Sequence, residues 1–145
     1  MSQNRSQARS HAVQALYQWQ MNEGNVVAIA DQILAGSPDS DLDVGYFREL
    51  LSGVTGNLTR LDAALGPHLD RAIASVDPVE RAILRLGVFE LADKPEIPYK
   101  VVINESVELA KVFGADQGHK FINGVLDKVA KDLRTFEVDA AKGKR

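Results

Sequence analysis

The sequence of 145 residues contains no cysteine and only two methionines. Disulfide bonds, thiolate metal ligands and cysteine nucleophiles are therefore excluded, and this composition suits a reducing compartment such as the cytoplasm. No apolar run approaches the roughly 20 residues that a membrane-spanning helix needs. The first ten residues are polar where a secretory signal needs an apolar core. We therefore expect a cytoplasmic protein without membrane partners, long enough to fold around its own core.

Motifs of the common enzyme classes are also missing. The chain has no glycine-rich phosphate loop, no dinucleotide fingerprint, no HExxH and no Gly-x-Ser-x-Gly. His11, His68 and His119 lack the close spacing of a helical metal site, so we interpret them as surface or partly buried histidines. Glu105 and Glu108 are neighbours on one helical turn, which fits a solvated, ion-paired face better than a catalytic pair. We predict no enzymatic activity, no metal and no cofactor.

The net charge is only -3, but the charges are unevenly distributed along the chain. Residues 1–20 carry two arginines and no acid, residues 21–70 hold eight acids against two bases, and residues 118–145 hold seven bases against four acids. An electrostatic binding surface is local, because salt screens charges beyond about 10 Å. The basic ends are therefore candidates for binding an anionic partner although the whole chain is weakly acidic.

Apolar residues recur with the period of a helix throughout the chain, and no alternating strand pattern is present. We expect an all-α fold of about seven helices. A helical pattern is present in the following segments, of which some are very short: residues 5–21, 26–35, 44–55, 58–65, 68–75, 79–92, 98–113 and 119–135.

Several helix ends have recognisable signals. Asp43 is a candidate N-cap, and Asp77 followed by Pro78 combines an N-cap with proline at the first helical position. Gly114 is suited to the residue that follows a helix. The helix that begins after Asp77 is apolar on most of its circumference, so we expect it at the centre of the fold.

The first helix has arginines in line with its apolar stripe. Arg5 and Arg9 fall on the same side as Ala12 and Leu16 when residues are placed at 100° intervals. Such arginines either extend past the core or direct their long side chains to its edge. Two guanidinium groups near a helix N-terminus favour an anion, so phosphate binding is one interpretation and ordinary solvated arginines are the other.

The last helix carries a strip of lysines next to an aromatic ring. Lys120, Lys128 and Lys131 project to one side, with Gly124 between them and Phe121 at the border of the apolar arc. A basic groove edged by an aromatic ring is typical of proteins that bind single-stranded nucleic acid, where cations hold phosphates and the ring stacks on bases. The alternative is that Phe121 packs inward and the lysines form a solvated face.

A series of motifs extends in order over nearly the whole chain. They are RSHAVQALYQWQ from Arg9, YF at Tyr46 with GV at Gly53, VERAILR from Val79, PYKVVINE from Pro98, ELAK from Glu108, FG at Phe113 and HKFINGVLDK from His119. Together these motifs and the chain length resemble the NusB family of bacterial antitermination factors.

The resemblance implies both a fold and a function. The implied fold is a single helical domain of two bundles, at about residues 1–76 and 77–136, with a frayed basic tail at 137–145. The implied function is binding of boxA, a single-stranded RNA element of ribosomal RNA operons, together with the ribosomal protein NusE. With the other Nus factors and RNA polymerase, this complex prevents premature termination of transcription.

The resemblance also implies roles for individual residues. The basic N-terminal segment of the family corresponds to Arg5 and Arg9, and its exposed aromatic residue corresponds to Phe121. His68 stands where relatives can carry a tyrosine near the RNA, and Tyr17 lies in the first-helix motif. Many relatives begin with a run of arginines, whereas this chain has two, which predicts fewer phosphate contacts and a weaker, less salt-dependent complex. With the lysines of the last helix, the predicted RNA-binding residues are Arg5, Arg9, Tyr17, His68, Lys120, Phe121 and Lys128.

Glu80 and the acidic middle of the chain are candidates for contacting a basic ribosomal protein, although solvated acids are the commoner explanation. Two other functions are compatible with the sequence. The chain could be a helical adaptor that binds proteins but not RNA, or a homodimer that hides its RNA-binding face.

Overall fold

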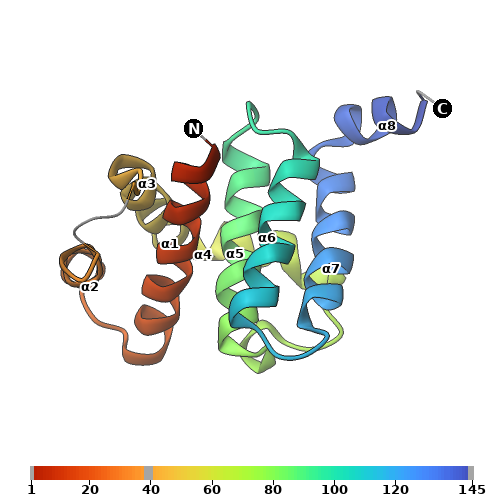
Figure 1. Ribbon diagram of the computed structural model, residues 1–145. Helices are drawn as coiled ribbons and strands as arrows, with labels where there is room; N and C mark the ends of the chain where they lie inside the picture. Colours follow the sequence, from red (N-terminus) through yellow and green to blue (C-terminus); the bar gives the residue numbers. More distant parts are fainter. Residues whose placement is uncertain (1, 38–40, 144–145) are drawn as a thin grey trace. The chain divides into compact units, whose positions relative to one another are not determined.

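The computed structural model describes residues 2–37 and 41–143. This part of the chain consists of α-helices and two short 3-10 turns, without a strand, which confirms the expected all-α fold (Figure 1). The chain divides into two compact units at residue 58, so each unit is described by itself.

Unit 1, residues 1–58, is built on three helices: α1 (Ser2–Asn22), α2 (Val26–Ala35) and α3 (Val44–Thr55). Helix α1 packs against both α2 and α3, and the apolar stripe predicted from the sequence is buried between them. Asp43 caps α3 as expected, since its Oδ1 accepts a hydrogen bond from the Tyr46 N–H at 3.0 Å. Asn25 caps α2 in the same way.

Unit 2, residues 59–145, has a core of three helices that pack pairwise and run side by side in Figure 1. These are α5 (Pro78–Asp93), α6 (Tyr99–Phe113) and α7 (Gly118–Leu133). Helix α5 is buried on nearly all sides, which confirms its predicted central place. Asp77 caps it, because Asp77 Oδ2 accepts the N–H groups of Val79 and Glu80, each at 3.1 Å.

The two compact units divide at residue 58, whereas the resemblance implies two bundles that divide near residue 76, and this division into bundles stays a prediction. Ion pairs join the segment between residues 58 and 76 to α5. In α4 (Leu58–Leu65), Asp62 forms a two-pronged ion pair with Arg85 at 2.8 and 2.9 Å. Arg60 pairs with Asp93 in the same manner, at 2.9 Å. Helical periodicity alone carries no sign of these long-range pairs.

The expected helix at residues 68–75 does not form. Two 3-10 turns, η1 (Gly66–His68) and η2 (Ile73–Ser75), stand there instead, and the backbone between them is irregular. Arg81 accounts for the second turn, because its Nη1 donates to the carbonyl groups of Ile73, Ala74 and Val76 at 3.3–3.5 Å. Carbonyl groups held by a side chain in this way do not need a continuing helix to satisfy them.

The segment expected to be a frayed tail forms an additional helix, α8 (Thr135–Gly143). Arg134 directly precedes α8 and is buried. It fixes the start of α8 by donating hydrogen bonds to the carbonyl groups of Leu91 and Lys94, at 2.8 and 3.0 Å. Glu137 joins α8 to α6, because it accepts the Tyr99 N–H at 2.8 Å and an Arg134 N–H at 2.6 Å. These contacts satisfy the otherwise unpaired ends of α5 and α6.

Candidate nucleic-acid interface

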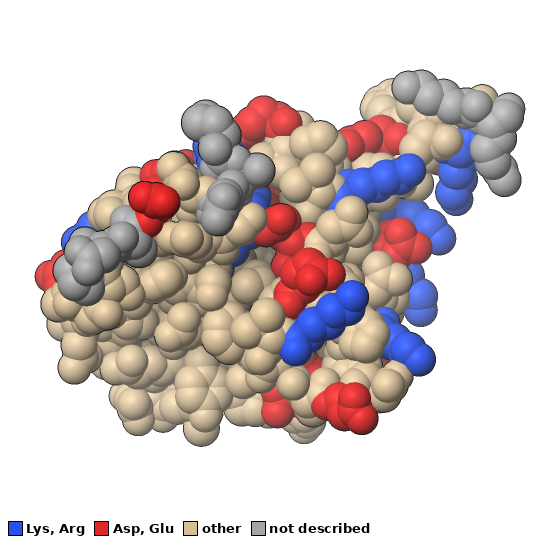
Figure 2. Space-filling model, viewed as in Figure 1, with Lys and Arg blue, Asp and Glu red and all other residues tan. Residues whose placement is uncertain are grey.

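Helix α7 presents the predicted lysine strip on its exposed face. Its apolar side is buried, at Ile122, Val125, Leu126, Val129 and Ala130. On the opposite side Lys120, Lys128 and Lys131 are exposed. In Figure 2, lysine and arginine side chains line the right-hand edge of the molecule, where α7 runs in Figure 1. The strip is therefore open to a partner.

Gly124 lies between Lys120 and Lys128 on this face and leaves the backbone uncovered. A Cβ atom added there would meet no other atom within 4 Å. The surface beside the lysines is thus free of steric cover, as we predicted. A phosphate backbone could approach the helix closely at this point.

Phe121 is half-buried at the edge of the strip, so the structure favours neither a fully inward ring nor a fully exposed one. One face of its ring lies against a residue that we did not predict. The guanidinium carbon of Arg71 is 5.1 Å from the ring centroid, within the range of a cation–π contact. Arg71 comes from the irregular segment between the two 3-10 turns.

Sequence reasoning missed Arg71 for two reasons. It is far from Phe121 in the sequence, and it directly follows Asp70, so the pair cancels in any count of local charge. No motif or periodicity marks the contact, because an irregular loop brings it about.

The start of α7 is shaped by Gln117, Gly118 and Glu80. Gln117 adopts a left-handed backbone with φ of 69°, which turns the chain into the helix. Gly118 follows, buried against the carboxylate of Glu80, so closely that a side chain at this position would collide with Glu80 Oε2. Gly118 therefore has to be a glycine unless Glu80 moves.

Glu80 is only 7% exposed, which leaves little of its side chain for the partner contact that we predicted. Burial raises the pKa of its carboxyl group above the ordinary value of 4.5, the charge of Asp77 adds to this, and Arg71 opposes it. Within the chain, Glu80 packs against the beginning of α7.

His68 does not lie free for stacking on a base. Its Nε2 is 2.7 Å from Asp132 Oδ2 on the last turns of α7, and its side chain is 19% exposed. The ring therefore lies against the same helix that carries Phe121 and Lys128. An RNA that reaches this site would contact only the exposed part of the His68 side chain, which is already paired to Asp132.

In unit 1 the two predicted arginines have different surroundings. The guanidinium carbon of Arg5 lies 4.2 Å from the centroid of the Tyr46 ring and that of Arg9 lies 5.7 Å from it. Arg5 is half-exposed, but Arg9 is only 3% exposed. The burial of Arg9 argues against a direct phosphate contact. Tyr17, farther along α1, is 40% exposed.

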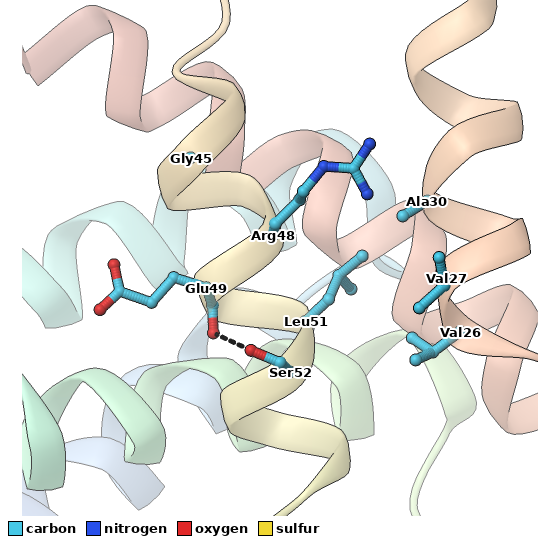
Figure 3. Close-up of a pocket in the computed structure, with 8 residues that line it drawn as sticks. All are labelled: Val26, Val27, Ala30, Gly45, Arg48, Glu49, Leu51 and Ser52. Atoms are coloured by element: carbon cyan, nitrogen blue, oxygen red, sulfur yellow. Dashed lines mark hydrogen bonds between the residues drawn. The ribbon is translucent and has the colours of Figure 1, made fainter.

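Unit 1 also contains an apolar groove between α2 and α3 that we did not predict (Figure 3). Val26, Val27 and Ala30 of α2 face Leu51 of α3 across a volume of about 460 Å³. At its rim Arg48 is paired to Asp31 at 2.8 Å. The groove offers apolar surface and an arginine that is already neutralised, so it is not a site for phosphate.

In residues 2–37 and 41–143, no three His, Cys, Asp or Glu side chains are grouped so that they could hold a metal ion. No described helix combines the length and hydrophobicity that a membrane crossing requires.

The arrangement defines an all-helical protein with an exposed basic helix face edged by an aromatic ring. The sequence profile of the NusB family matches residues 6–131, and the chain belongs to this family. The transcription antitermination protein NusB of Hydrogenovibrio crunogenus is 53% identical over 133 residues, which cover 92% of this chain and 83% of that protein. Its counterpart in Yersinia pestis is 51% identical over 130 residues, which cover 90% of this chain and 94% of that one.

Solved structures agree with this assignment. A NusB from a crystal structure of the antitermination factors NusB and NusE in complex with double-stranded RNA superposes with a TM-score of 0.84. It shares 28% identity over 91% of this chain and 99% of its own. The solution structure of NusB from Aquifex aeolicus has a TM-score of 0.78 and 27% identity, and covers 91% of this chain and 90% of its own.

Proposed function

We propose that this chain is a transcription antitermination factor that binds single-stranded RNA of the boxA type together with a ribosomal protein of the NusE kind. The observation that carries the proposal is the exposed face of α7, where Lys120 and Lys128 flank an uncovered Gly124 beside the half-buried Phe121. Its relatives in the NusB family are named as antitermination proteins. The role requires binding in the bacterial cytoplasm, where transcription occurs, and no catalysis.

The chemistry of the α7 face favours an unpaired strand. Lysines bind phosphates of any nucleic acid, but an aromatic ring stacks only on a base that is not already stacked within a duplex. One related NusB has been crystallised with NusE and double-stranded RNA. The strandedness of the RNA is therefore a variable to test, and we propose that this chain prefers the single strand.

The other predicted residues differ in how accessible they are to RNA. Arg5 is half-exposed and remains a candidate for phosphate contact, as does Tyr17 for stacking. His68 would contribute through its exposed edge while paired to Asp132. Arg9 and Glu80 are assigned structural roles instead, because both are buried.

A partner protein is expected to supplement the RNA affinity of this chain. The net charge is -3, and the described N-terminal segment offers a single accessible arginine. Counterion release scales with the number of phosphates neutralised, so few contacts give weak binding. A basic ribosomal protein adds phosphate contacts, and we propose that other Nus factors and RNA polymerase join this complex indirectly.

The substitution Phe121→Ala tests the proposal. It should weaken binding of a boxA-type single strand by roughly 1–3 kcal/mol and leave the salt dependence unchanged, because stacking involves no counterions. Fluorescence anisotropy of labelled RNA, with and without NusE, measures both quantities. Phe136→Ala on α8 is the matched control, since its ring is 93% exposed and lies outside the site; this variant should bind like the parent protein.

The outcomes separate the competing functions. Equal RNA affinity of the Phe121→Ala variant and the parent would reject the stacking role. Binding of NusE without any RNA preference would identify a protein-binding adaptor instead. If light scattering shows a dimer that RNA converts to a monomer, then self-association masks the site.

A further inference from the structure

The loop residue Arg71 lies over one face of the Phe121 ring. Its guanidinium carbon lies 5.1 Å from the centroid of the phenyl ring. The ring belongs to the site proposed above, so any account of base stacking has to say what Arg71 does when RNA arrives. Either the guanidinium leaves, or it becomes part of the binding surface.

The second partner of Arg71 is Asp70. Arg71 Nε donates to Asp70 Oδ1 at 2.8 Å and Arg71 Nη2 donates to Oδ2 at 3.1 Å. This two-pronged geometry is the one in which a guanidinium also binds phosphate. The hydrogen bonds from Arg71 lower the pKa of Asp70 below its ordinary value, so the pair stays charged at neutral pH.

The ion pair between Arg71 and Asp70 is exposed and therefore easily exchanged. The side chains are 43% and 70% exposed, respectively, and exposed pairs between adjacent groups contribute little to stability. A phosphate could replace Asp70 with small loss. The contact of Arg71 with Phe121 need not be lost in this exchange, because a guanidinium can lie with its flat face on a ring while its edge donates hydrogen bonds.

We propose that Arg71 is an RNA-binding residue that stays stacked on Phe121 and exchanges Asp70 for an RNA phosphate. Its outer face then extends the stacking surface, since bases stack on guanidinium planes as well as on aromatic rings. Asp70 competes with the RNA phosphate for the same hydrogen-bond donors of Arg71. This proposal rests on the proposed function of the α7 face and adds to it a second segment, the loop between η1 and η2.

Three variants test the proposal by RNA anisotropy across a salt series. Arg71→Ala should weaken binding of the boxA-type strand about fivefold or more and reduce the salt slope by about 0.7, the value for one phosphate of a single strand. Arg71→Lys should keep the slope but lose affinity, because lysine retains the charge without the flat, two-pronged group. Asp70→Asn should strengthen binding by up to about fivefold, since it removes an exposed competitor.

Arg48→Ala provides the control for a general loss of charge. Arg48 is also an exposed arginine paired to an aspartate, with side chains 45% and 61% exposed, and it lies at the α2–α3 groove. Its replacement should leave RNA affinity unchanged. Thermal melting of Arg48→Ala and Asp70→Asn should match the parent protein, because these side chains are exposed. Arg71→Ala also removes an attraction to the buried Glu80, so its melting is compared with that of Arg71→Lys, which keeps the charge.

Opposite outcomes would overturn the proposal. An increase in affinity for Arg71→Ala would identify Arg71 as a cover that must leave the ring. Unchanged affinity and slope in that variant, alongside weakened binding of Phe121→Ala, would reject Arg71 while sustaining the proposed function. If the parent protein binds no RNA even with NusE, both proposals fail.

Discussion

Arg5 and Arg9 lie one helical turn apart on α1 and approach the same aromatic ring, yet their surroundings separate their roles. Both guanidinium groups lie over Tyr46 of α3, but Arg9 is 3% exposed whereas Arg5 is half-exposed. A buried arginine contributes the packing of its long stem as well as its charge. We therefore assign Arg9 to the stability of unit 1 and leave Arg5 for contact with phosphate.

Arg9→Ala should destabilise unit 1 by about 1–3 kcal/mol, because it removes buried contacts with Tyr46. Arg5→Ala should leave the stability nearly unchanged and reduce the salt slope of RNA binding by about 0.7. Urea unfolding followed by circular dichroism, together with RNA anisotropy, measures both effects. Equal stability of the two variants would show that the burial of Arg9 has no energetic weight.

The sequence pattern predicted these arginines in the apolar stripe but not which of them is buried. Helical periodicity predicts the side of a helix on which a residue lies. It does not predict how far the neighbouring helix extends over that side. Tyr46, which both arginines contact, belongs to another helix, α3. The prediction for Lys120, Lys128 and Gly124 was more successful, because an exposed helix face follows from the 100° repeat alone.

At the scale of elements, Glu80 and Glu137 lie at helix starts in unit 2, and the pKa values of their carboxyl groups are shifted in opposite directions. Glu80 lies buried against the first residue of α7, and burial raises the pKa of its carboxyl group. Glu137 is also partly buried, which opposes its ionisation, but the hydrogen bonds from the Tyr99 N–H and from Arg134 prevail and lower its pKa. The contribution of each glutamate to stability therefore depends on pH, with opposite sign for the two groups.

Replacement of each glutamate by glutamine should reveal these signs. Glu80→Gln should raise the melting temperature by a few degrees at pH 7, since the buried charge costs stability. This gain should shrink as the pH falls through the raised pKa of the folded state and vanish below the ordinary value of 4.5. Calorimetry between pH 3.5 and about 8 covers this window.

Glu137→Gln should lower the melting temperature at pH 7 instead. The loss should shrink as the pH falls from 4.5 through the lowered pKa of the folded state, where the native carboxyl group also becomes neutral. The two variants thus serve as controls for each other. Shifts of the same sign at pH 7 would contradict the assignment of Glu80 as a buried, poorly compensated charge.

Most helices were predictable, because capping residues and apolar stripes are local. Helix α8 and the two 3-10 turns were not, since their formation depends on distant partners. Arg134 reaches carbonyl groups at the end of α5, and Arg81 reaches those of η2. A side chain that satisfies another segment's backbone groups leaves no periodic trace in the sequence.

At the scale of the whole molecule, the charge total obscures where anions can bind. The chain has a net charge of -3, but α7 carries its lysines on one exposed face. Family membership and this face together support a role in which RNA and a basic protein are bound at once. The part of the candidate site that lies on α7 was predictable from the sequence. The part that lies on the loop with Arg71 was not.

Photo-crosslinking of a boxA-type strand that contains 4-thiouridine tests the central claim most directly. Trypsin cleaves after Lys120 and Lys128, so contact with Phe121 would place the crosslink on the peptide of residues 121–128. The peptide of residues 135–142 carries the fully exposed Phe136 and serves as an internal control. We predict crosslinks on 121–128, strengthened by NusE and absent from 135–142. Crosslinks confined to other peptides would show that RNA binds elsewhere on the protein.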